Sequence, residues 1–403
     1  MNINSELIDE FARVQTEQAM SRIVSVVKAE EFGTDDLCRL AEAMGRSGAM
    51  IDISRDHPSA DLVSTGGPGS LSTLLAPLFL RAYGLFVPKL GVPGRPAGGI
   101  DVLAQIPGYR IRLSAPEVLE ILSRCGYAHF LADDVFAPLD AAFFRYRQKV
   151  GAQDVPALAI ASLLAKKIAC GVKYAGLDVR VAPHGNFGAT YDEARQAART
   201  FCAAARGASI EAVASLTDAR TPYQPYIGRG EALLAIRMIV DGRPDPWLAE
   251  HIDRCRLMAA QVASMSPGSR LSRGFDIGNV FFEHLEAQGS SKEAFYEKTN
   301  LVAAAANREL SADRDGFLRV DVPELRSVFV AVNSRIAAAD GFPDELGVIL
   351  RQRPGAYVRR GDLLASVRAN DAIWHEFAAA LTKCFQVVDL LNYAPGLEEV
   401  IRA

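Results

Sequence analysis

The chain has little of what marks a secreted, metal-binding or membrane protein. Its 403 residues include six cysteines and six histidines, which form no CxxC pair and no HExxH or similar ligand spacing. Scattered cysteines of this kind indicate reduced thiols rather than a disulfide framework. We therefore expect a cytoplasmic protein without a metal site, whose histidines are isolated surface or structural residues.

Long hydrophobic runs and a dominant charge are also missing. No stretch approaches the roughly 20 apolar residues that span a bilayer, and the acidic N-terminus lacks the basic start and apolar core of a secretory signal. The net charge is only −4, which gives no general attraction to nucleic acid or to acidic membranes. We expect neither as a partner, so any site for an anion must be local.

What is present suits a large α/β protein. Apolar residues make up 49% of the chain, enough for two or three domains with a substantial core. Residues Leu7 to about Met50 show helical spacing, with Thr34 as the expected N-cap of one helix. Short strand-like runs then alternate with longer helical ones, among them Leu85–Lys89, Ala115–Cys125, Pro156–Cys170 and Leu177–Val181. This alternation predicts a largely parallel sheet between helices.

From about Glu324 the pattern changes to short alternating segments between glycine and proline turns. The segments expected to be strands are Ser327–Val332, the stretches within Leu346–Ala369, and Phe385–Leu391. We predict a small β-rich domain there.

A glycine-rich turn is the first feature that points to chemistry. In Asp61–Leu78, DLVSTGGPGSLSTLLAPL, the turn should follow a strand and Ser70 or Ser72 should begin a helix. Unpaired N–H groups at such a turn and the helix dipole favour an anion such as phosphate. Taken alone the pattern is weak, because a tight strand-to-helix turn that binds nothing has the same sequence.

Six further stretches share an order with this turn. They are TDDLCRLAEAMGRSGAMIDIS, PGRPAGGIDVLAQIPGYR, APLDAAFFRYRQ, IASLLAKKIACGVKYAGLDVRV, LTDARTPYQPYIGRGEAL and GAYVRRGDLLASVRA, which run from Thr34 to Ala369. Together with DLVSTGGPGS, the series resembles that of the pyrimidine-nucleoside phosphorylases, the thymidine phosphorylase family. Each motif is weak by itself, whereas their common order is a strong signal for the fold.

The resemblance implies a split helical domain that faces a larger α/β domain across a cleft, with a central, mostly parallel sheet and a C-terminal β-rich subdomain. The expected division is residues 1–60 and 151–175 for the helical domain, 61–150 and 176–323 for the α/β domain, and 324–403 for the β-rich part. It also implies a homodimer that takes a nucleoside or nucleobase and phosphate, with phosphate as co-substrate and no other cofactor.

The positions that the resemblance assigns to the base are present. Ser162 and Lys166 lie four residues apart on a predicted helix and therefore on one face, and they match the family's serine and lysine that hydrogen-bond the pyrimidine. Arg147 matches its base-binding arginine. Two cations and a hydroxyl would stabilise the charge that builds on the leaving base, so Arg147 and Lys166 are the candidate catalytic residues. A solvated helix face is the alternative interpretation.

The phosphate positions are less complete. Where the family has Lys-His-Ser-Thr-Gly-Gly, this chain has Leu62 and Val63 before the turn, and Ile100 replaces a threonine. The predicted phosphate ligands are Ser64, Thr65, Gly66, Gly67, Gly69 and Thr73. Lys89 and Arg95 are the cations predicted to restore positive charge beside the turn. An equally good interpretation of Lys89 and Arg95 is that they are exposed surface residues. His184 is a further candidate donor, and Val63 is expected to make the base pocket more apolar.

Two other functions stay open on this sequence. The loss of a charge and of hydrogen-bond donors at Leu62, Val63 and Ile100 is compatible with a family member that has no activity and binds a nucleoside or regulates a partner. The anthranilate phosphoribosyltransferase family shares the two-domain plan and the glycine-rich turn, but it requires a metal-bound pyrophosphate site. Asp133 and Asp134 are the remote candidates for such a site.

Overall fold

The computed structural model describes residues 3–29, 31–53, 57–65, 67–94, 96–183, 185, 187–335, 342–390 and 398–402. The chain opens with three helices, α1 (Ile3–Val14), α2 (Glu17–Lys28) and α3 (Thr34–Gly45). Thr34 is the first residue of α3 and Gly33 is its N-cap, so the predicted cap is one residue too late. The Asp36 carboxylate accepts a hydrogen bond from Gly33 N at 3.1 Å and closes this helix end instead.

The central sheet is mostly parallel. It has the order β1 (Ala60–Ser64), β4 (Tyr174–Val181), β5 (Glu211–Asp218) and β13 (Glu399–Arg402), and only β13 runs antiparallel. The strands β2 (Val87–Gly91) and β3 (Tyr127–Leu131) form a parallel pair. Backbone hydrogen bonds from Ala60 N to Phe86 O and from Phe86 N to Pro58 O join the start of β2 to β1. The layer is therefore continuous across the molecule.

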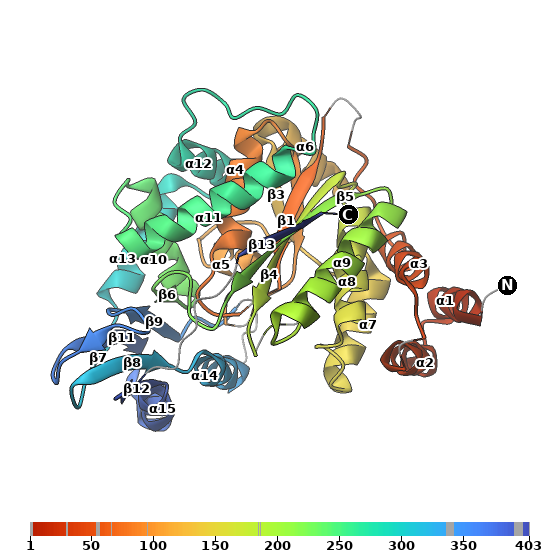
Figure 1. Cartoon of the computed structure of the whole chain (residues 1–403). Coiled ribbons are helices and arrows are strands. Elements are labelled where there is room, and N and C mark those ends of the chain that lie inside the picture. The colour runs from red at the N-terminus through yellow and green to blue at the C-terminus, as the bar shows by residue number, and fades with distance from the viewer. Residues whose placement is uncertain are drawn as a thin grey trace.

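Helices cover both faces of this layer, as Figure 1 shows. One face carries α8 (Pro156–Ala169) and α9 (Tyr191–Gly207), and the other carries α4 (Ser72–Ala82) and α11 (Pro246–Ala263). Because both faces are covered, β4 is buried over seven of its eight residues, as parallel strands usually are. The remaining helices before the C-terminal region are α5 (Gly99–Leu103), α6 (Ala115–Cys125), α7 (Pro138–Lys149), α10 (Arg229–Val240), α12 (Ile277–Ala287) and α13 (Lys292–Ala304).

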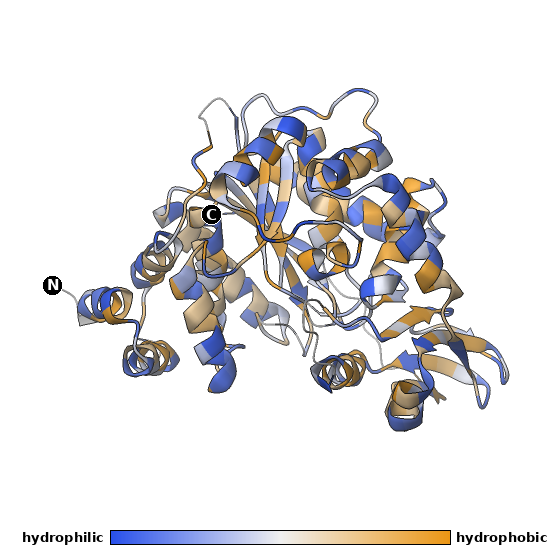
Figure 2. Ribbon diagram, turned by 180° about the vertical axis from the view of Figure 1, so that it is seen from behind, coloured by the Kyte–Doolittle hydropathy of each residue, from blue (hydrophilic) through white to orange (hydrophobic). Residues whose placement is uncertain are grey.

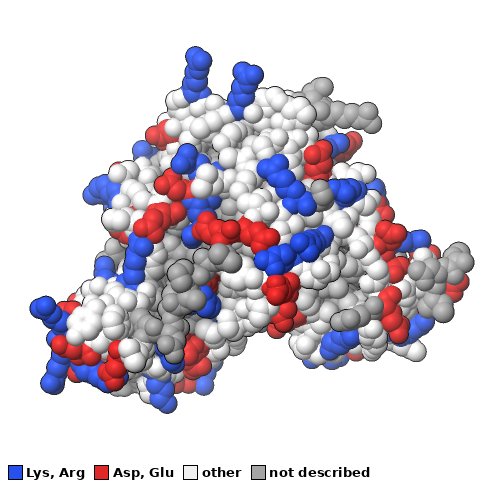
Figure 3. Space-filling view, viewed as in Figure 1, with Lys and Arg blue, Asp and Glu red and all other residues white. Residues whose placement is uncertain are grey.

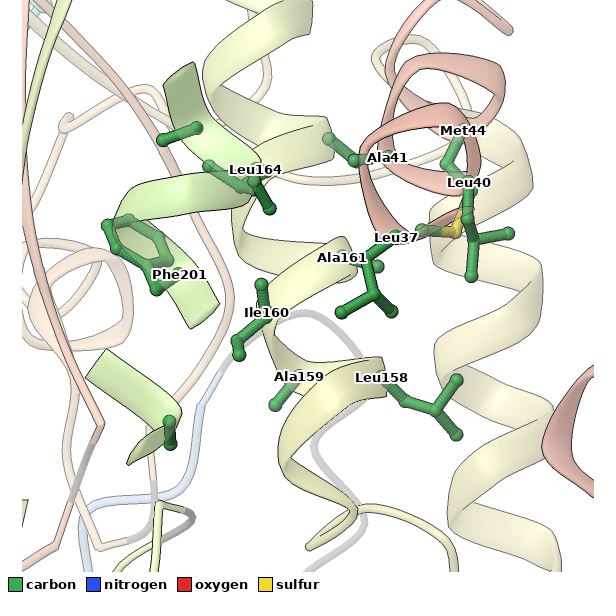
Figure 4. Packing of buried hydrophobic residues seen from close by; sticks show 14 of the residues in the cluster. Leu37, Leu40, Ala41, Met44, Leu158, Ala159, Ile160, Ala161, Leu164 and Phe201 are labelled. Atoms are coloured by element: carbon green, nitrogen blue, oxygen red, sulfur yellow. The ribbon is translucent and has the colours of Figure 1, made fainter. Parts of the chain in front are cut away.

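The helical layer packs closely on α8. Leu37, Leu40, Ala41 and Met44 recur along α3 at helical spacing and are buried against α8, whose Leu158, Ala161 and Leu164 lie in the same cluster (Figure 4). Gly45 allows the approach, because a Cβ there would lie only 2.6 Å from the Ala165 carbonyl oxygen. Seen from behind, the helices show apolar residues on one side and polar residues on the other (Figure 2). This contact holds α8, and with it Ser162 and Lys166, against the N-terminal helices.

The C-terminal region contains two antiparallel sheets. Their orders are β6-β9-β11-β7 and β10-β8-β12, and their strands are β6 (Tyr226–Ile227), β7 (Asn307–Ser311), β8 (Gly316–Val320), β9 (Leu346–Leu350), β10 (Tyr357–Val358), β11 (Leu363–Ala369) and β12 (Phe385–Val388). The helices α14 (Val322–Arg335) and α15 (Asp371–Lys383) pack with them. The predicted fold class is confirmed: helices, a mostly parallel central sheet and a β-rich C-terminal part. The exact domain division stays a prediction, and β6, β7 and β8 of the antiparallel sheets precede Glu324.

One predicted strand is wrong. Ser327–Val332 lies inside the helix α14. Its β-branched residues favour a strand, but the buried residues of this helix are Val322, Leu325, Val328, Phe329 and Val332, each of which has another of the set three or four positions away. That spacing fits one face of a helix packed on the β-rich core. The spacing of the apolar residues therefore predicts this segment better than its content of β-branched residues does.

The surface carries charges of both signs. On the face drawn in Figure 3, acidic and basic side chains are interspersed, and the outline is hollowed between the β-rich part and the N-terminal helices. Among the described helices, none is both long and apolar enough to span a bilayer.

Candidate functional site

A pocket of about 250 Å³ lies where several parallel strands end. Residues at or just beyond the carboxyl ends of β1, β2 and β4 line it, together with α7, α8 and the start of α4. This is the usual position of a ligand site in an open α/β sheet. Two walls face the pocket, a base wall formed by α7 and α8 and a turn wall formed by the glycine turn and the segment from Lys89 to Gly99.

Lys166 is the centre of the base wall. Its ammonium group forms an ion pair with Asp140 and also donates to the Ser162 carbonyl oxygen at 3.1 Å and to Ser162 Oγ at 2.9 Å. These three partners use its three N–H groups. Ser162 Oγ accepts from Lys166, and Ser162 also lines the pocket. Burial lowers the pKa of Lys166, while Asp140 opposes that shift.

Arg147 lies beside this pair and is only 2% exposed. Within the described residues, its Nε and Nη1 atoms are buried and have no hydrogen-bond acceptor. Burial lowers the pKa of Arg147, and the nearby Asp140 and Asp154 oppose that effect. A buried guanidinium with unused donors at a pocket wall is suited to a ligand that brings acceptors such as carbonyl oxygens.

Apolar side chains fill the space around these polar groups. Phe144, Leu163 and Phe187 line the pocket, and Val63 at the end of β1 does so as well. Planar rings suit such a lining, because aromatic and aliphatic walls desolvate the faces while a few polar groups read the edges. Arg147, Ser162, Lys166 and Val63 thus line one pocket, and their roles in binding stay a prediction.

The glycine turn forms part of the opposite wall. Ser64, Thr65, Gly67 and Thr73 line the pocket, and α4 begins at Ser72, as predicted. Gly67 has a φ of 109°, which L side chains rarely adopt. Gly69 does not line this pocket. A Cβ on Gly69 would lie 2.3 Å from Pro222 Cβ, so the absence of a side chain allows Pro222 to pack against the turn.

Arg180 on β4 braces the turn from behind. Its guanidinium donates to the Gly67 carbonyl oxygen at 2.6 Å and to the Pro68 carbonyl oxygen at 2.8 Å, and it lies over the Tyr223 ring. Asp178 on the same strand accepts a hydrogen bond from Ser72 Oγ at 2.8 Å. Burial raises the pKa of Asp178, and Arg180 opposes the rise. The turn is therefore fixed in shape by buried charges.

Lys89 is a buried structural cation rather than an exposed surface residue. Its Nζ donates to Asp61 Oδ1 at 2.8 Å and to the Leu62 carbonyl oxygen at 2.6 Å, although the residue also lines the pocket. Lys167 forms an ion pair with the other oxygen of Asp61. Burial favours the neutral acid, but the two lysines outweigh it and hold the pKa of Asp61 below its usual range.

The residues that interrupt the family's phosphate pattern are apolar and buried. Leu62 is 1% exposed and packs in the cluster that contains α4 and α11, and Ile100 is fully buried in that same cluster. Neither lines the pocket among the described residues. The predicted ligands Gly66 and Arg95, and the candidate donor His184, lie outside the residues that the structure describes.

Sequence reasoning missed other pocket residues. Arg180, His129 and Arg326 line the pocket, and Arg326 comes from α14 in the β-rich region. Tyr127 and His129 lie two residues apart on β3 and share a face of that strand. This spacing is the one sequence feature that could have linked the histidine to a hydrogen-bond partner. Nothing in the sequence joins α14 to the pocket.

The expectation of no metal site can be examined only for the residues that the structure describes. Within the described ranges, no group of three or more His, Cys, Asp or Glu side chains could hold a metal ion. Asp133 pairs with Arg112, Asp134 pairs with Arg145, and neither aspartate lines the pocket. These two acids therefore give no support to a metal-bound pyrophosphate at this site.

Comparison with known proteins identifies a relative. The chain is 28% identical to a thymidine phosphorylase of Sinorhizobium fredii (strain NBRC 101917 / NGR234) over 358 residues, which cover 84% of this chain and 80% of that protein. No family model matches. Among solved structures, anthranilate phosphoribosyltransferase from Saccharomyces cerevisiae matches with a TM-score of 0.47 and 10% identity, over 74% of this chain and 90% of that chain. The resemblance drawn from the ordered motifs is confirmed by the first of these comparisons.

Proposed function

We propose that this chain, a divergent relative of the thymidine phosphorylases, is a pentosyltransferase. It would cleave the N-glycosidic bond of a pyrimidine-like nucleoside or nucleotide with phosphate as acceptor. The observation that carries the proposal is the convergence of Arg147, Ser162 and Lys166 on one wall of the pocket, opposite the glycine turn. The sequence relationship to thymidine phosphorylase supports it.

In this proposal each wall serves one half of the reaction. A phosphate oxygen on the turn wall attacks the anomeric carbon, the bond from that carbon to the ring nitrogen breaks, and its electron pair leaves with the base. The proton of hydrogen phosphate balances the base anion, so the products are free base and sugar 1-phosphate. Arg147 and the Lys166–Ser162 pair stabilise the charge on the departing ring. The pocket holds both reactants in one orientation.

The apolar walls bear on the substrate. Val63, Phe144, Leu163 and Phe187 favour a base with hydrophobic faces and few polar groups beyond those that meet Arg147 and Ser162. We therefore propose a substrate that differs from thymidine and uridine.

A second candidate function is a binding protein without activity. The observation that favours it is the state of the positions beside the turn wall: Leu62 and Ile100 are apolar and buried, and Lys89 is already paired with Asp61. Such a protein would hold a nucleoside against Arg147 without transferring the sugar.

One experiment separates the two. The purified protein is incubated with a panel of nucleosides and phosphate, and free base is measured by chromatography. Release that is lost in Lys166→Ala and Arg147→Ala, but kept in the matched surface variant Lys149→Ala, supports the enzyme. Thermal stabilisation by a nucleoside without release supports the binding protein. If neither Lys166→Ala nor Arg147→Ala alters binding or release, the site assignment fails.

A further inference from the structure

A buried histidine reaches the turn wall through a gap made by two glycines. His129 on β3 is 1% exposed and lines the pocket. A Cβ on Gly91 would lie 2.8 Å from its Nε2 atom, and a Cβ on Gly99 would lie 2.4 Å from its Cε1 atom. Both distances are shorter than real Cβ contacts. Neither glycine has a positive φ that would require glycine for the backbone, so their missing side chains serve to admit the imidazole.

The ring is held in one orientation from behind. The Tyr127 hydroxyl lies 3.0 Å from His129 Nδ1 and, among the described residues, has no other partner. A buried phenol must donate its proton, and Nδ1 is the acceptor within reach. Nδ1 then carries no hydrogen, so the neutral ring has its proton on Nε2. Burial, with help from Lys89, His284 and Lys167, lowers the pKa of His129 well below its usual value.

The backbone of His129 is fixed as well. The side chain of Gln288 accepts a hydrogen bond from His129 N at 3.1 Å and donates to the His129 carbonyl oxygen. The same amide donates to the Arg110 carbonyl oxygen at 2.8 Å. Main chain and side chain are thus both anchored, which is the support that a binding group needs to act as a preorganised donor.

The surroundings of Nε2 suit an oxyanion. The Thr73 carbonyl oxygen, at the first turn of α4, lies 3.2 Å from the same Cβ position of Gly99, so the imidazole lies close to the main chain of Thr73, and both residues line the pocket. Behind this wall, two ammonium groups, Lys89 and Lys167, share one carboxylate, Asp61. The excess positive charge is buried but near, and charge and donor together favour an anion.

We propose that His129 Nε2–H is a hydrogen-bond donor to the acceptor anion, a phosphate-type tetrahedral oxyanion, and that it replaces donors missing at Leu62 and Ile100. This inference rests on the proposed function, because it assigns a ligand of the acceptor for that reaction. It makes His129 a determinant of acceptor binding, separate from Arg147, Ser162 and Lys166 on the base wall.

The test compares two amides at this position. Gln places a donor near the position of Nε2, whereas Asn reaches only the position of Nδ1. Binding of inorganic phosphate is measured by titration calorimetry for the full chain, His129→Asn, His129→Gln and the control His375→Asn, whose histidine is exposed on α15. We expect phosphate binding to weaken roughly ten- to hundredfold in His129→Asn, with recovery in His129→Gln, no change in His375→Asn and an unchanged nucleoside affinity.

A second variant blocks the imidazole edge of His129 without replacing the histidine. Gly91→Ala places a methyl group against Nε2, so the same loss of phosphate affinity is expected with the histidine intact. This variant decides the matter if His129→Asn does not fold.

The outcomes separate the two proposals. Base release that continues in His129→Asn with an unchanged KM for phosphate overturns this inference and leaves the proposed function in place. Base release by the unaltered protein without phosphate, slowed in His129→Asn, also overturns it, because the ring would then act as a base toward water. A protein that neither binds phosphate nor releases base contradicts the proposed function and this inference together.

Discussion

The base wall and the turn wall contain similar charged groups that are used in different ways. On the base wall, Arg147 Nε and Nη1 have no acceptor among the described residues, and Ser162 Oγ accepts a hydrogen bond from Lys166. On the turn wall, two nitrogens of Arg180 donate to carbonyl oxygens of the turn, and Lys89 is paired with Asp61. The difference teaches that a count of cations around a pocket does not measure its capacity to bind. The partners of each cation decide whether a charge serves the ligand or the fold.

The largest effect should come from the base wall. In Lys166→Ala the buried Asp140 carboxylate loses its cation, which should lower the free energy of unfolding by about 3–5 kcal/mol and abolish base release. Asp140→Asn combined with Lys166→Ala should restore much of the stability and none of the release. Urea unfolding and chromatography measure the two quantities. Equal instability of the single and double variants would show that the ion pair is not the cause.

Arg147 should behave in the opposite way. Arg147→Met removes a buried guanidinium with unused donors, so the free protein should be at least as stable as before. Nucleoside affinity should fall roughly ten- to hundredfold. Denaturation midpoints and calorimetric titration check the two parts. A large loss of stability would mean that the guanidinium serves the fold, as Arg180 does on the turn wall.

Two buried histidines outside the pocket, of which His251 supports the start of α4 behind the turn wall, should make the fold sensitive to acid. Burial lowers the pKa of His251 and of His284 to about 3. His251 Nε2 accepts a hydrogen bond from Leu71 N at 2.8 Å, directly before α4. The unfolded chain binds protons that the folded chain rejects, so stability is full above the unfolded value near pH 6.5 and falls as the pH drops toward 3.

At about pH 5 each of these histidines should cost about 2 kcal/mol of unfolding free energy relative to pH 7. Urea unfolding at the two pH values measures the difference. In His251→Gln, whose amide oxygen can still accept from Leu71 N, the pH dependence should become shallower. An unchanged slope in that variant would exclude His251 as one of the titrating groups.

The smallest effect should come from Val63, where the two walls meet. Val63→Thr exchanges a methyl group for a hydroxyl of similar size on a half-buried residue. The relative rates for two nucleosides that differ in base polarity should shift by roughly tenfold or less. Competition between the two substrates, followed by chromatography, measures the shift. A shift in relative rates that exceeds the fold-loss of nucleoside affinity in Arg147→Met would contradict the smaller effect expected for Val63.

The sequence was sufficient for the elements that carry a strong period. Ser162 and Lys166 were placed on one helix face by their spacing, and β4 and α6 were recognised from their local patterns. The strand predicted at Ser327–Val332 is wrong because its β-branched residues favour a strand whereas the spacing of its apolar residues fits a helix. The prediction follows the residue types and not the spacing. Contacts between distant segments were out of reach, since nothing local links Lys89 to Asp61, 28 residues earlier. His129 was passed over because a lone histidine has no motif, and its role depends on the space above Gly91 and Gly99.

The last strand of the described chain has a consequence for handling the protein. By pairing with β5, β13 covers what would otherwise be the outer edge of the central sheet. An open edge offers a row of free amides and carbonyls to any other extended polypeptide. Shortening or crowding this segment would therefore show itself first as poor solubility in preparations at high concentration, before any change at the pocket.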